Sequence, residues 1–229
     1  MSAKIDLWKT VKERENQRLK PEPLLSVCII TQDPNEIIMN FPDWVQLVIG
    51  VNGKSDSYHS KVDVSENGSK LITIGWDKFS FAKVRNMTCQ HADGLYTMQL
   101  DTDEDFRHWD ELKQLLENNQ DIEAFTVSVI SMTQDYELIN TRSNRIFKTG
   151  YKYWGAVHET IDIDLDKHNK KAVNTALRIN HYGYFTDNEG ILNKLRRNLK
   201  LFEDNYELFQ YEYYRKKYVE TINKLKEFE

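Results

Sequence analysis

Short and almost wholly apolar runs mark the first half of the chain. They cover residues 24–30 (LLSVCII), 44–53 (WVQLVIGVNG), 70–76 (KLITIGW) and 95–100 (LYTMQL). Runs of this length and composition are typical of strands that are buried on both faces, as in a parallel sheet. Between the third and fourth runs, residues 79–91 (FSFAKVRNMTCQH) carry apolar residues at helical spacing. The order of these elements predicts an α/β domain.

The second half of the chain alternates in the same way before it becomes helical. Residues 108–119 predict an amphipathic helix, residues 122–132 a strand, and residues 145–161 (RIFKTGYKYWGAVHETI) a strand, a turn and a second strand. After Gly190 the chain has no glycine or proline and is rich in Leu, Glu, Lys and Tyr. We therefore expect an N-terminal helix and linker (1–23), an α/β domain (24–189) and a C-terminal helical extension (190–229).

Charge and cysteine content limit the partners and the compartment. The 229 residues carry a formal net charge of −5, which gives no overall attraction to nucleic acid or to an anionic membrane, although a local basic groove is still permitted. Cys28 and Cys89 fall in a strand-like run and in a helix, as buried thiols of a reducing compartment do. No run approaches the roughly 20 apolar residues that span a bilayer. The sequence predicts a soluble, cytoplasmic protein.

The run at 95–100 ends in a cluster of carboxylates, Asp101, Asp103, Glu104 and Asp105. A strand delivers side chains to its end with high positional precision, so two aspartates spaced i, i+2 can project into one crevice and hold a divalent cation. Such a cation can bridge a diphosphate. A bare D-x-D pattern also fits an acidic turn after a buried strand, and the remaining motifs decide between the two.

Three segments resemble one enzyme family in the expected order. They are LSVCIITQDPNE (25–36), FAKVRNMTCQHADGLYTMQLDTDED (81–105), and RIFKTGYKYWGAVHETI followed by RINHYGY (178–184). Together they resemble the family 2 nucleotide-sugar-dependent glycosyltransferases of GT-A type, in a branch that includes lipopolysaccharide core and peptide-modifying enzymes. The resemblance covers residues 24 to 203. It implies a mixed central sheet flanked by helices, with a helical appendage at the C-terminus.

The resemblance also implies roles for individual residues. Asp103 is the first candidate ligand of Mn²⁺ or Mg²⁺, and Asp101 is expected to contact the ribose or a metal-bound water. Arg85 is expected to reach the donor or to buttress the aspartates, with Asn86 beside it. His158 and His181 are further candidate contacts of the metal or the diphosphate. Thr31 and Asp33 are expected at the nucleobase. Asn52 and Gly53 are candidates in the loop after the second strand.

The last matching segment predicts the residues on the acceptor side of the site. Glu159 is the candidate base that removes the acceptor proton, with Asp162 and Asp164 as fallbacks. Tyr153 and Trp154 are expected either to form an apolar platform for a sugar ring or to pack in the core. Tyr182 and Tyr184 are expected either to flank His181 or to pack in the core. The chain departs from the family at Asn52, where an aspartate that reads uracil is usual, so UDP is only the favoured donor.

These observations lead to one hypothesis and two alternatives. We expect a metal-dependent inverting glycosyltransferase that moves a hexose from a nucleotide diphosphate sugar, UDP-glucose or a close relative. The sequence does not distinguish between three acceptors: a saccharide, a peptide or protein side chain, and a modified nucleic acid base. The negative net charge disfavours the nucleic acid base. The alternatives are a non-catalytic GT-A-like nucleotide or saccharide-binding module, and a nucleotidyltransferase, which ordinarily has a glycine-rich loop where this chain has TQDPNE.

Overall fold

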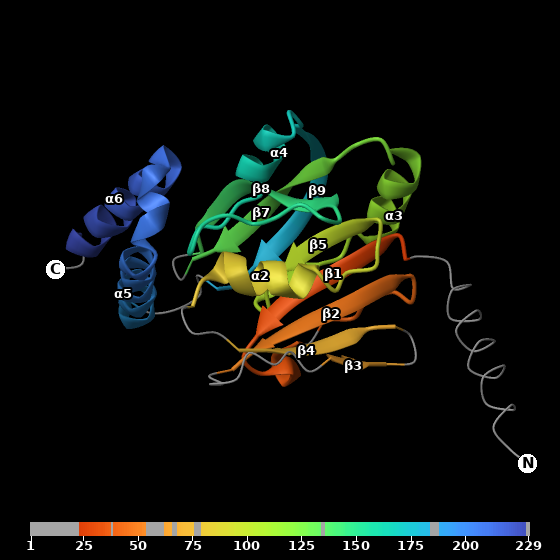
Figure 1. The fold of residues 1–229 in the computed structure, drawn as a ribbon, viewed down its shortest axis with the longest axis horizontal. Helices are drawn as coiled ribbons and strands as arrows, with labels where there is room; N and C mark the ends of the chain where they lie inside the picture. Colours follow the sequence, from red (N-terminus) through yellow and green to blue (C-terminus); the bar gives the residue numbers. More distant parts are fainter. Residues whose placement is uncertain are drawn as a thin grey trace, which may run out of the picture.

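A nine-stranded mixed sheet forms the centre of the molecule, and its strand order is β3-β4-β2-β1-β5-β8-β7-β9-β6 (Figure 1). The computed structural model describes residues 23–37, 39–53, 62–65, 68–75, 79–133, 136–183 and 188–227, except for the side chains of residues 209 and 210. The elements of these residues are, in chain order, β1 (Leu25–Thr31), η1 (Pro34–Glu36), β2 (Val45–Asn52), β3 (Val62–Val64), β4 (Lys70–Ile74), α2 (Phe81–Cys89), β5 (Tyr96–Leu100), β6 (Glu104–Phe106), α3 (Trp109–Asn118), β7 (Ala124–Met132), β8 (Leu138–Lys148), α4 (Asp162–Lys167), β9 (Ala172–His181), α5 (Asn188–Asp204), η2 (Tyr206–Gln210) and α6 (Glu212–Lys226).

The predicted elements agree with this order in most places. The four apolar runs are β1, β2, β4 and β5, and the predicted helices and strand at 79–91, 108–119 and 122–132 are α2, α3 and β7. The prediction for residues 145–161 is wrong in its second half. β8 ends at Lys148, and the residues after it form a loop in which a single bridge pairs Trp154 with Thr160. The N-terminal helix expected within residues 1–23 lies almost wholly outside the described residues.

The parallel part of the sheet brings several strand ends to one edge. β1 pairs in parallel with β2 on one side and with β5 on the other, and β2 pairs in parallel with β4. The strand order therefore reverses between β1 and β5, where ligands of open α/β sheets bind beyond the carboxyl ends of the strands. Thr31, Asn52 and Asp101 stand at the ends of these strands. β8 continues the sheet antiparallel to β5.

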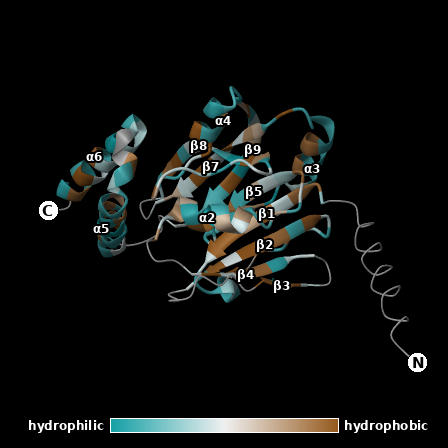
Figure 2. Ribbon diagram, in the orientation of Figure 1, coloured by the Kyte–Doolittle hydropathy of each residue, from teal (hydrophilic) through white to brown (hydrophobic). Residues whose placement is uncertain are grey.

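Both faces of β1 are buried, which explains its uninterrupted apolar sequence. Leu25, Val27 and Ile29 join a core that includes side chains of β5 and α3, whereas Cys28 and Ile30 join a second core with α2 and α4. Figure 2 shows the hydrophobic strands in the middle of the molecule and mostly hydrophilic residues on α5 and α6. The sheet is thus a middle layer between helices, as the α/β prediction requires.

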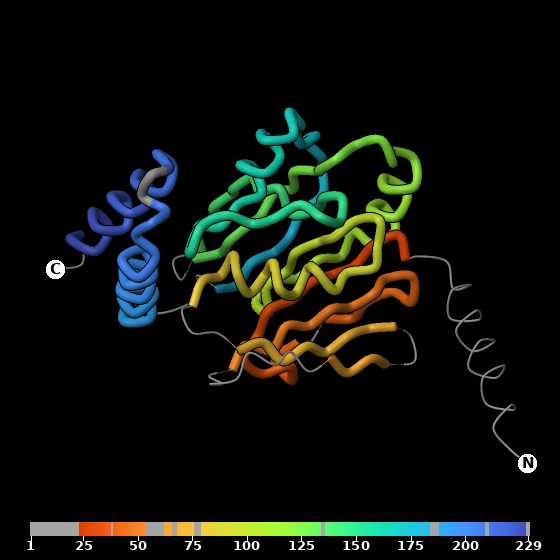
Figure 3. The backbone as a smooth tube through the Cα atoms, in the orientation of Figure 1, coloured from red at the N-terminus to blue at the C-terminus, as the bar shows by residue number. Residues whose placement is uncertain are grey.

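The C-terminal helices α5 and α6 lie against each other at one side of the sheet (Figure 3). Their buried residues form a third core with Ala156 and Val157 of the loop between β8 and α4. In the part of the chain that the structure describes, no helix has both the length and the apolar character needed to cross a bilayer.

Candidate functional site

A buried arginine on α2 stands at the centre of the candidate site. Ser80 caps the start of this helix, and the helix turns Arg85, which is 5% exposed, toward the end of β5. Arg85 Nη2 donates to Asp101 Oδ1 at 2.8 Å, and Arg85 Nε donates to Glu159 Oε1 at 2.5 Å. Burial disfavours the charged guanidinium, but the two carboxylates raise the pKa of Arg85 well above its ordinary value. Arg85 therefore joins the carboxylate cluster to the candidate base.

A second arginine, Arg145 on β8, is partly buried and was not identified as a site residue from the sequence. Its Nη2 donates to Glu104 Oε1 at 2.6 Å, and its Nη1 lies 3.9 Å from Asp101 Oδ2. Glu104 is 3% exposed, and its other oxygen accepts the Asp101 N–H at 2.9 Å. Two guanidinium groups thus offset three carboxylates, those of Asp101, Glu104 and Glu159. The network fixes the first aspartate of the D-x-D pattern.

The pKa values of two carboxylates of this network, Asp101 and Glu104, shift in opposite directions. Burial would raise the pKa of Asp101, but Arg85 and Arg145 hold it below its ordinary value. Burial raises the pKa of Glu104 to about 7, with Asp101 adding to the rise and Arg145 opposing it. Asp101 is therefore an ionised anchor, whereas Glu104 takes up a proton near neutral pH.

Asp103, the second aspartate of the pattern, has a different environment. Its side chain is 43% exposed, and its Oδ2 lies 3.5 Å from His181 Nε2. β6 and β9 bring the two residues together, since Glu104 pairs with His181 in the sheet and the Tyr182 N–H donates to the Asp103 carbonyl at 2.9 Å. Ser131 Oγ and His181 Nδ1 share a hydrogen bond of 2.9 Å, which fixes the ring with Nε2 toward Asp103.

Asp103 and His181 bring two candidate metal-ligating atoms close together. A Cβ on Gly183 would lie 2.1 Å from Asp103 Oδ2 and 2.6 Å from His181 Nε2, so the position admits only glycine if both side chains are to stay in place. Carboxylate oxygen and imidazole nitrogen both suit manganese. The described residues contain no group of three or more histidine, cysteine or acidic side chains that could hold a metal ion. Such an ion would therefore need further ligands from phosphate oxygens or water, as Mg²⁺ usually does.

The nucleobase candidates lie at the ends of β1 and β2. Thr31 Oγ1 and the backbone of Asp33 bond to each other, and Asp33 Oδ1 accepts the Asn35 N–H at 2.9 Å, so both residues shape the loop after β1. Asn52 is 7% exposed, and its buried Oδ1 has no hydrogen-bond partner among the described residues. A Cβ on Gly53 would meet no atom within 4 Å. Asn52 thus carries a buried acceptor that has no partner among the described residues.

The loop after β8 directs Glu159 toward Arg85 and directs His158 toward the C-terminal helices. Asn86 on α2 holds this loop by two bonds, from its Nδ2 to the Tyr153 carbonyl at 2.9 Å and from the Tyr153 N–H to its Oδ1 at 2.8 Å. Glu159 then reaches Arg85. The His158 ring instead lies 6.2 Å from the Phe202 ring of α5. The site therefore brings together Asp103 and His181, and it leaves His158 at the C-terminal helices.

The two fallback bases belong to α4 and have structural partners. Asp162 Oδ1 accepts from Asn144 Nδ2 at 2.5 Å, and Asp164 Oδ2 accepts the Lys152 N–H at 2.9 Å. The latter bond ties the start of the Glu159-bearing loop to α4. Neither carboxylate is bonded to Arg85, which distinguishes them from Glu159.

The predicted aromatic contacts are largely covered. The Tyr153 ring is buried and lies 5.8 Å from Arg85 Cζ, while Lys167 Nζ lies 3.4 Å over the Trp154 ring. Tyr182 is exposed and contributes its backbone to Asp103. Tyr184 lies outside the described residues. Tyr153 therefore supports Arg85 from the core, whereas Trp154 is only partly buried and carries Lys167 over its ring.

Comparisons with known proteins reveal the fold. No protein-family model matches the chain, and no curated protein matches it. Among solved structures, the mannosyltransferase PcManGT from Pyrobaculum calidifontis, in complex with GDP-Man and Mn²⁺, is similar at a TM-score of 0.51 and 12% identity, over 95% of this chain and 76% of that one. S. aureus TarS 1-349, alone and with UDP, gives a TM-score of 0.41 at 12% and 13% identity. The match covers 78% of this chain and 65% of the TarS 1-349 chain. The chain thus has the mixed α/β fold of GT-A glycosyltransferases, with a large central sheet flanked by helices.

Proposed function

We propose that the protein is a metal-dependent inverting glycosyltransferase that moves a hexose from a nucleotide diphosphate sugar, UDP-glucose or a close relative, to a nucleophile on an acceptor. The observation that carries the proposal is the pairing of Asp103, in the turn between β5 and β6, with His181 at the end of β9, beside Gly183. β5 is one of the two strands between which the sheet order reverses. The fold shared with PcManGT, which is described with GDP-Man and Mn²⁺, agrees with this proposal.

In this proposal the donor lies along the ends of β1, β2 and β5. Asp103 and His181 would hold Mn²⁺ or Mg²⁺, which would neutralise the charge that develops on the departing diphosphate. Asp101, fixed by Arg85 and Arg145, faces the ribose side. Asn52 Oδ1 accepts a hydrogen bond from the nucleobase, because an unpaired acceptor that is already buried gains most from a donor.

On the acceptor side, Glu159 takes up the proton of the attacking hydroxyl. The bond between the anomeric carbon and the diphosphate oxygen breaks while the bond to the acceptor oxygen forms, so that the configuration inverts. Arg85 holds one carboxylate oxygen of Glu159, and the side chain keeps 12% exposure to the site. The acceptor itself is a saccharide, a peptide or a nucleic acid base.

Binding of nucleoside diphosphates tests the proposal. The melting temperature is measured with UDP, GDP, CDP and ADP, each with and without Mn²⁺, because a ligand that binds only the folded state raises stability by mass action. We expect stabilisation by one diphosphate, UDP first, that requires Mn²⁺ and is lost in Asp103→Ala. The control is Asp105→Ala, which removes a carboxylate two residues away whose ion-pair partner among the described residues is the exposed Arg107.

Hydrolysis of a sugar nucleotide is the second part of the test. The wild type and Asp105→Ala should hydrolyse UDP-glucose slowly in the presence of Mn²⁺, and Asp103→Ala should not. If no nucleoside diphosphate stabilises the wild type in the presence of Mn²⁺, the protein is not a nucleotide-sugar transferase. If a diphosphate binds but no sugar nucleotide is turned over, it is a binding module.

A further inference from the structure

The loop that carries Glu159 contains backbone conformations that need outside support. We define the Glu159 loop as residues 154–160. Gly155 has a φ of 104° and His158 a φ of 53°. Glycine adopts positive φ at little cost, but a residue with a side chain does so at a cost of roughly 1 kcal/mol or more. A conformation of this kind persists only where the surrounding structure determines it, and His158 directly precedes Glu159.

The support for this loop comes from the C-terminal helices. Ala156 and Val157 are buried in one core with Leu201 and Phe202 of α5 and Tyr214 of α6. This core is separate from the two cores that cover the faces of the sheet. The middle of the Glu159 loop is therefore buried by α5 and α6.

Two contacts fix His158 in particular. Tyr213 Oη of α6 donates to the His158 carbonyl at 3.2 Å, and the Phe202 ring of α5 lies 6.2 Å from the imidazole at an interplanar angle of 33°. The first contact is made to the backbone, and the second to a side chain that remains exposed. Both act on the one non-glycine residue of the loop that has positive φ.

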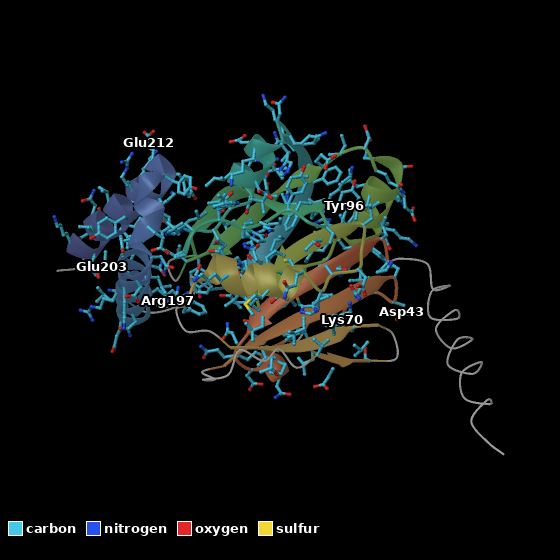
Figure 4. All side chains as sticks on the ribbon, viewed as in Figure 1. Asp43, Lys70, Tyr96, Arg197, Glu203 and Glu212 are labelled. Carbon is cyan, nitrogen blue, oxygen red and sulfur yellow. The ribbon has the colours of Figure 1, made fainter. Side chains whose placement is uncertain are left out.

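The same helices also hold the start of α2, which carries Arg85. Asn205 Nδ2, at the end of α5, donates to the Phe79 carbonyl at 3.3 Å, and the Phe81 N–H donates to the Ala156 carbonyl at 2.9 Å. Arg197, labelled on α5 in Figure 4, lies with its Cζ 5.2 Å from the centre of the Phe81 ring. α5 thus contacts both elements that supply the Arg85–Glu159 ion pair.

We infer that α5 and α6 belong to the catalytic unit, and that Tyr213 and Phe202 are positioning residues that hold Glu159 in reach of the acceptor. The inference rests on the proposed function, because it assigns Glu159 the role of base. Loosening the helices should move Glu159 relative to Arg85 while it leaves Asp103, His181 and Asn52 in place. The rate of turnover should then fall without a matching loss of donor affinity.

Tyr213→Phe tests this inference with a minimal change. It removes one hydroxyl and keeps the ring, so that folding is preserved. Tyr211→Phe is the matched control, because Tyr211 lies two residues away, its ring packs on Trp154, and its hydroxyl has no hydrogen bond among those recorded for the described residues. Turnover of UDP-glucose, the dissociation constant of UDP with Mn²⁺, and hydrogen exchange of residues 154–160 are measured for both variants.

We expect Tyr213→Phe to lower kcat by up to about tenfold, the worth of one hydrogen bond, while the dissociation constant of UDP changes by less than about twofold. Amides of residues 154–160 should exchange faster, and Tyr211→Phe should match the wild type. In a Glu159→Gln background Tyr213→Phe should cause no further loss, since both changes act through one carboxylate. Phe202→Leu should have the same pattern with a larger effect.

Three results would overturn the inference: unchanged exchange of residues 154–160 in Tyr213→Phe, an equal loss of UDP affinity and turnover, or full additivity with Glu159→Gln. The failure of the proposed function looks different. In that case the wild type itself binds no nucleoside diphosphate or turns over no sugar nucleotide, which removes the catalytic role of Glu159 and with it this assignment.

Discussion

Replacing Gly183 with alanine tests whether the site needs the space beside Asp103, because it adds one methyl group and leaves the candidate ligand side chains unchanged. Gly183 is not among the glycines with positive φ, so its backbone accepts a side chain without strain. The added Cβ would lie 2.1 Å from Asp103 Oδ2, although ordinary contacts of a Cβ begin at 3.4 Å. The carboxylate, the imidazole or the Gly183 backbone must therefore move by about 1 Å.

A shift of this size in a reacting group costs on the order of 100-fold in rate. We expect Gly183→Ala to lower Mn²⁺-dependent hydrolysis of UDP-glucose by one to two orders of magnitude and to weaken Mn²⁺ binding in the presence of UDP. Free Mn²⁺ can be counted directly by electron paramagnetic resonance. The free energy of unfolding should change by less than about 1 kcal/mol, because the substitution lies outside the three cores.

The control for this experiment is Gly190→Ala, the same chemical change within α5. It should leave metal binding unchanged, since alanine is a better helix former than glycine and the residue is not part of the proposed site. If Gly183→Ala binds Mn²⁺ and UDP as tightly as the wild type, the assignment of a metal to Asp103 and His181 is wrong.

Three further predictions concern the buried network and the donor. Arg145→Met should lower the free energy of unfolding at pH 7 by roughly 1–3 kcal/mol in urea denaturation, because it removes the partner of Glu104 Oε1 and leaves a buried carboxyl that stays protonated and short of one hydrogen bond; an unchanged free energy of unfolding would contradict the ion pair. The pKa of Glu104 is raised from 4.5 to about 7 in the folded state, so its stabilising contribution is complete below about pH 4.5 and is lost as the pH rises toward 7. The unfolding free energy of the wild type relative to Glu104→Gln should therefore fall over this window, and a pH-independent difference would refute the shift. Asn52→Ala should weaken UDP binding about tenfold in calorimetry and leave inorganic pyrophosphate binding unchanged; equal losses for both ligands would exclude a contact with the base.

The sequence predicted the strands that are buried on both faces and the helices that are buried along one side. β1, β2 and β5 are apolar over most of their length because both faces of the sheet are covered, and α2 and α3 show their buried side by helical spacing. β9 and the first half of β8 were missed. The first residues of β8 are exposed and mostly polar, so neither alternation nor an apolar run marks them. Their pairing with β7 creates these strands. For β8 it is a hairpin that sets Leu138 opposite Met132, and for β9 it joins residues distant in the chain, such as Ala172 and Ala124.

The site was predictable as far as its residues are close in sequence. Asp101 and Asp103 follow an apolar strand, and this pattern was selected only together with the three segments that resemble the enzyme family. Arg145 depends on the antiparallel register of β5 and β8, and Ser131 on the pairing of β7 with β9, which places it opposite His181. The RIFK segment contained a signal for Arg145, since a charged residue there begins an apolar stretch.

The orientation of His158 was beyond reach of the sequence for a different reason. A residue with positive φ sends its side chain in a direction that neither helical nor strand periodicity describes. The structure directs it to the C-terminal helices, and Glu159, the next residue, to Arg85. Adjacent residues of one motif thus serve two different parts of the molecule.

The central claim is that Asp103 and His181 hold a divalent cation that in turn holds the diphosphate of a sugar nucleotide. Anomalous diffraction from crystals grown with Mn²⁺ and UDP tests it most directly. The account predicts one strong manganese peak within about 2.5 Å of both Asp103 Oδ2 and His181 Nε2, with diphosphate oxygens completing the coordination. A manganese peak elsewhere, or bound UDP with no metal between these side chains and its phosphates, would contradict it.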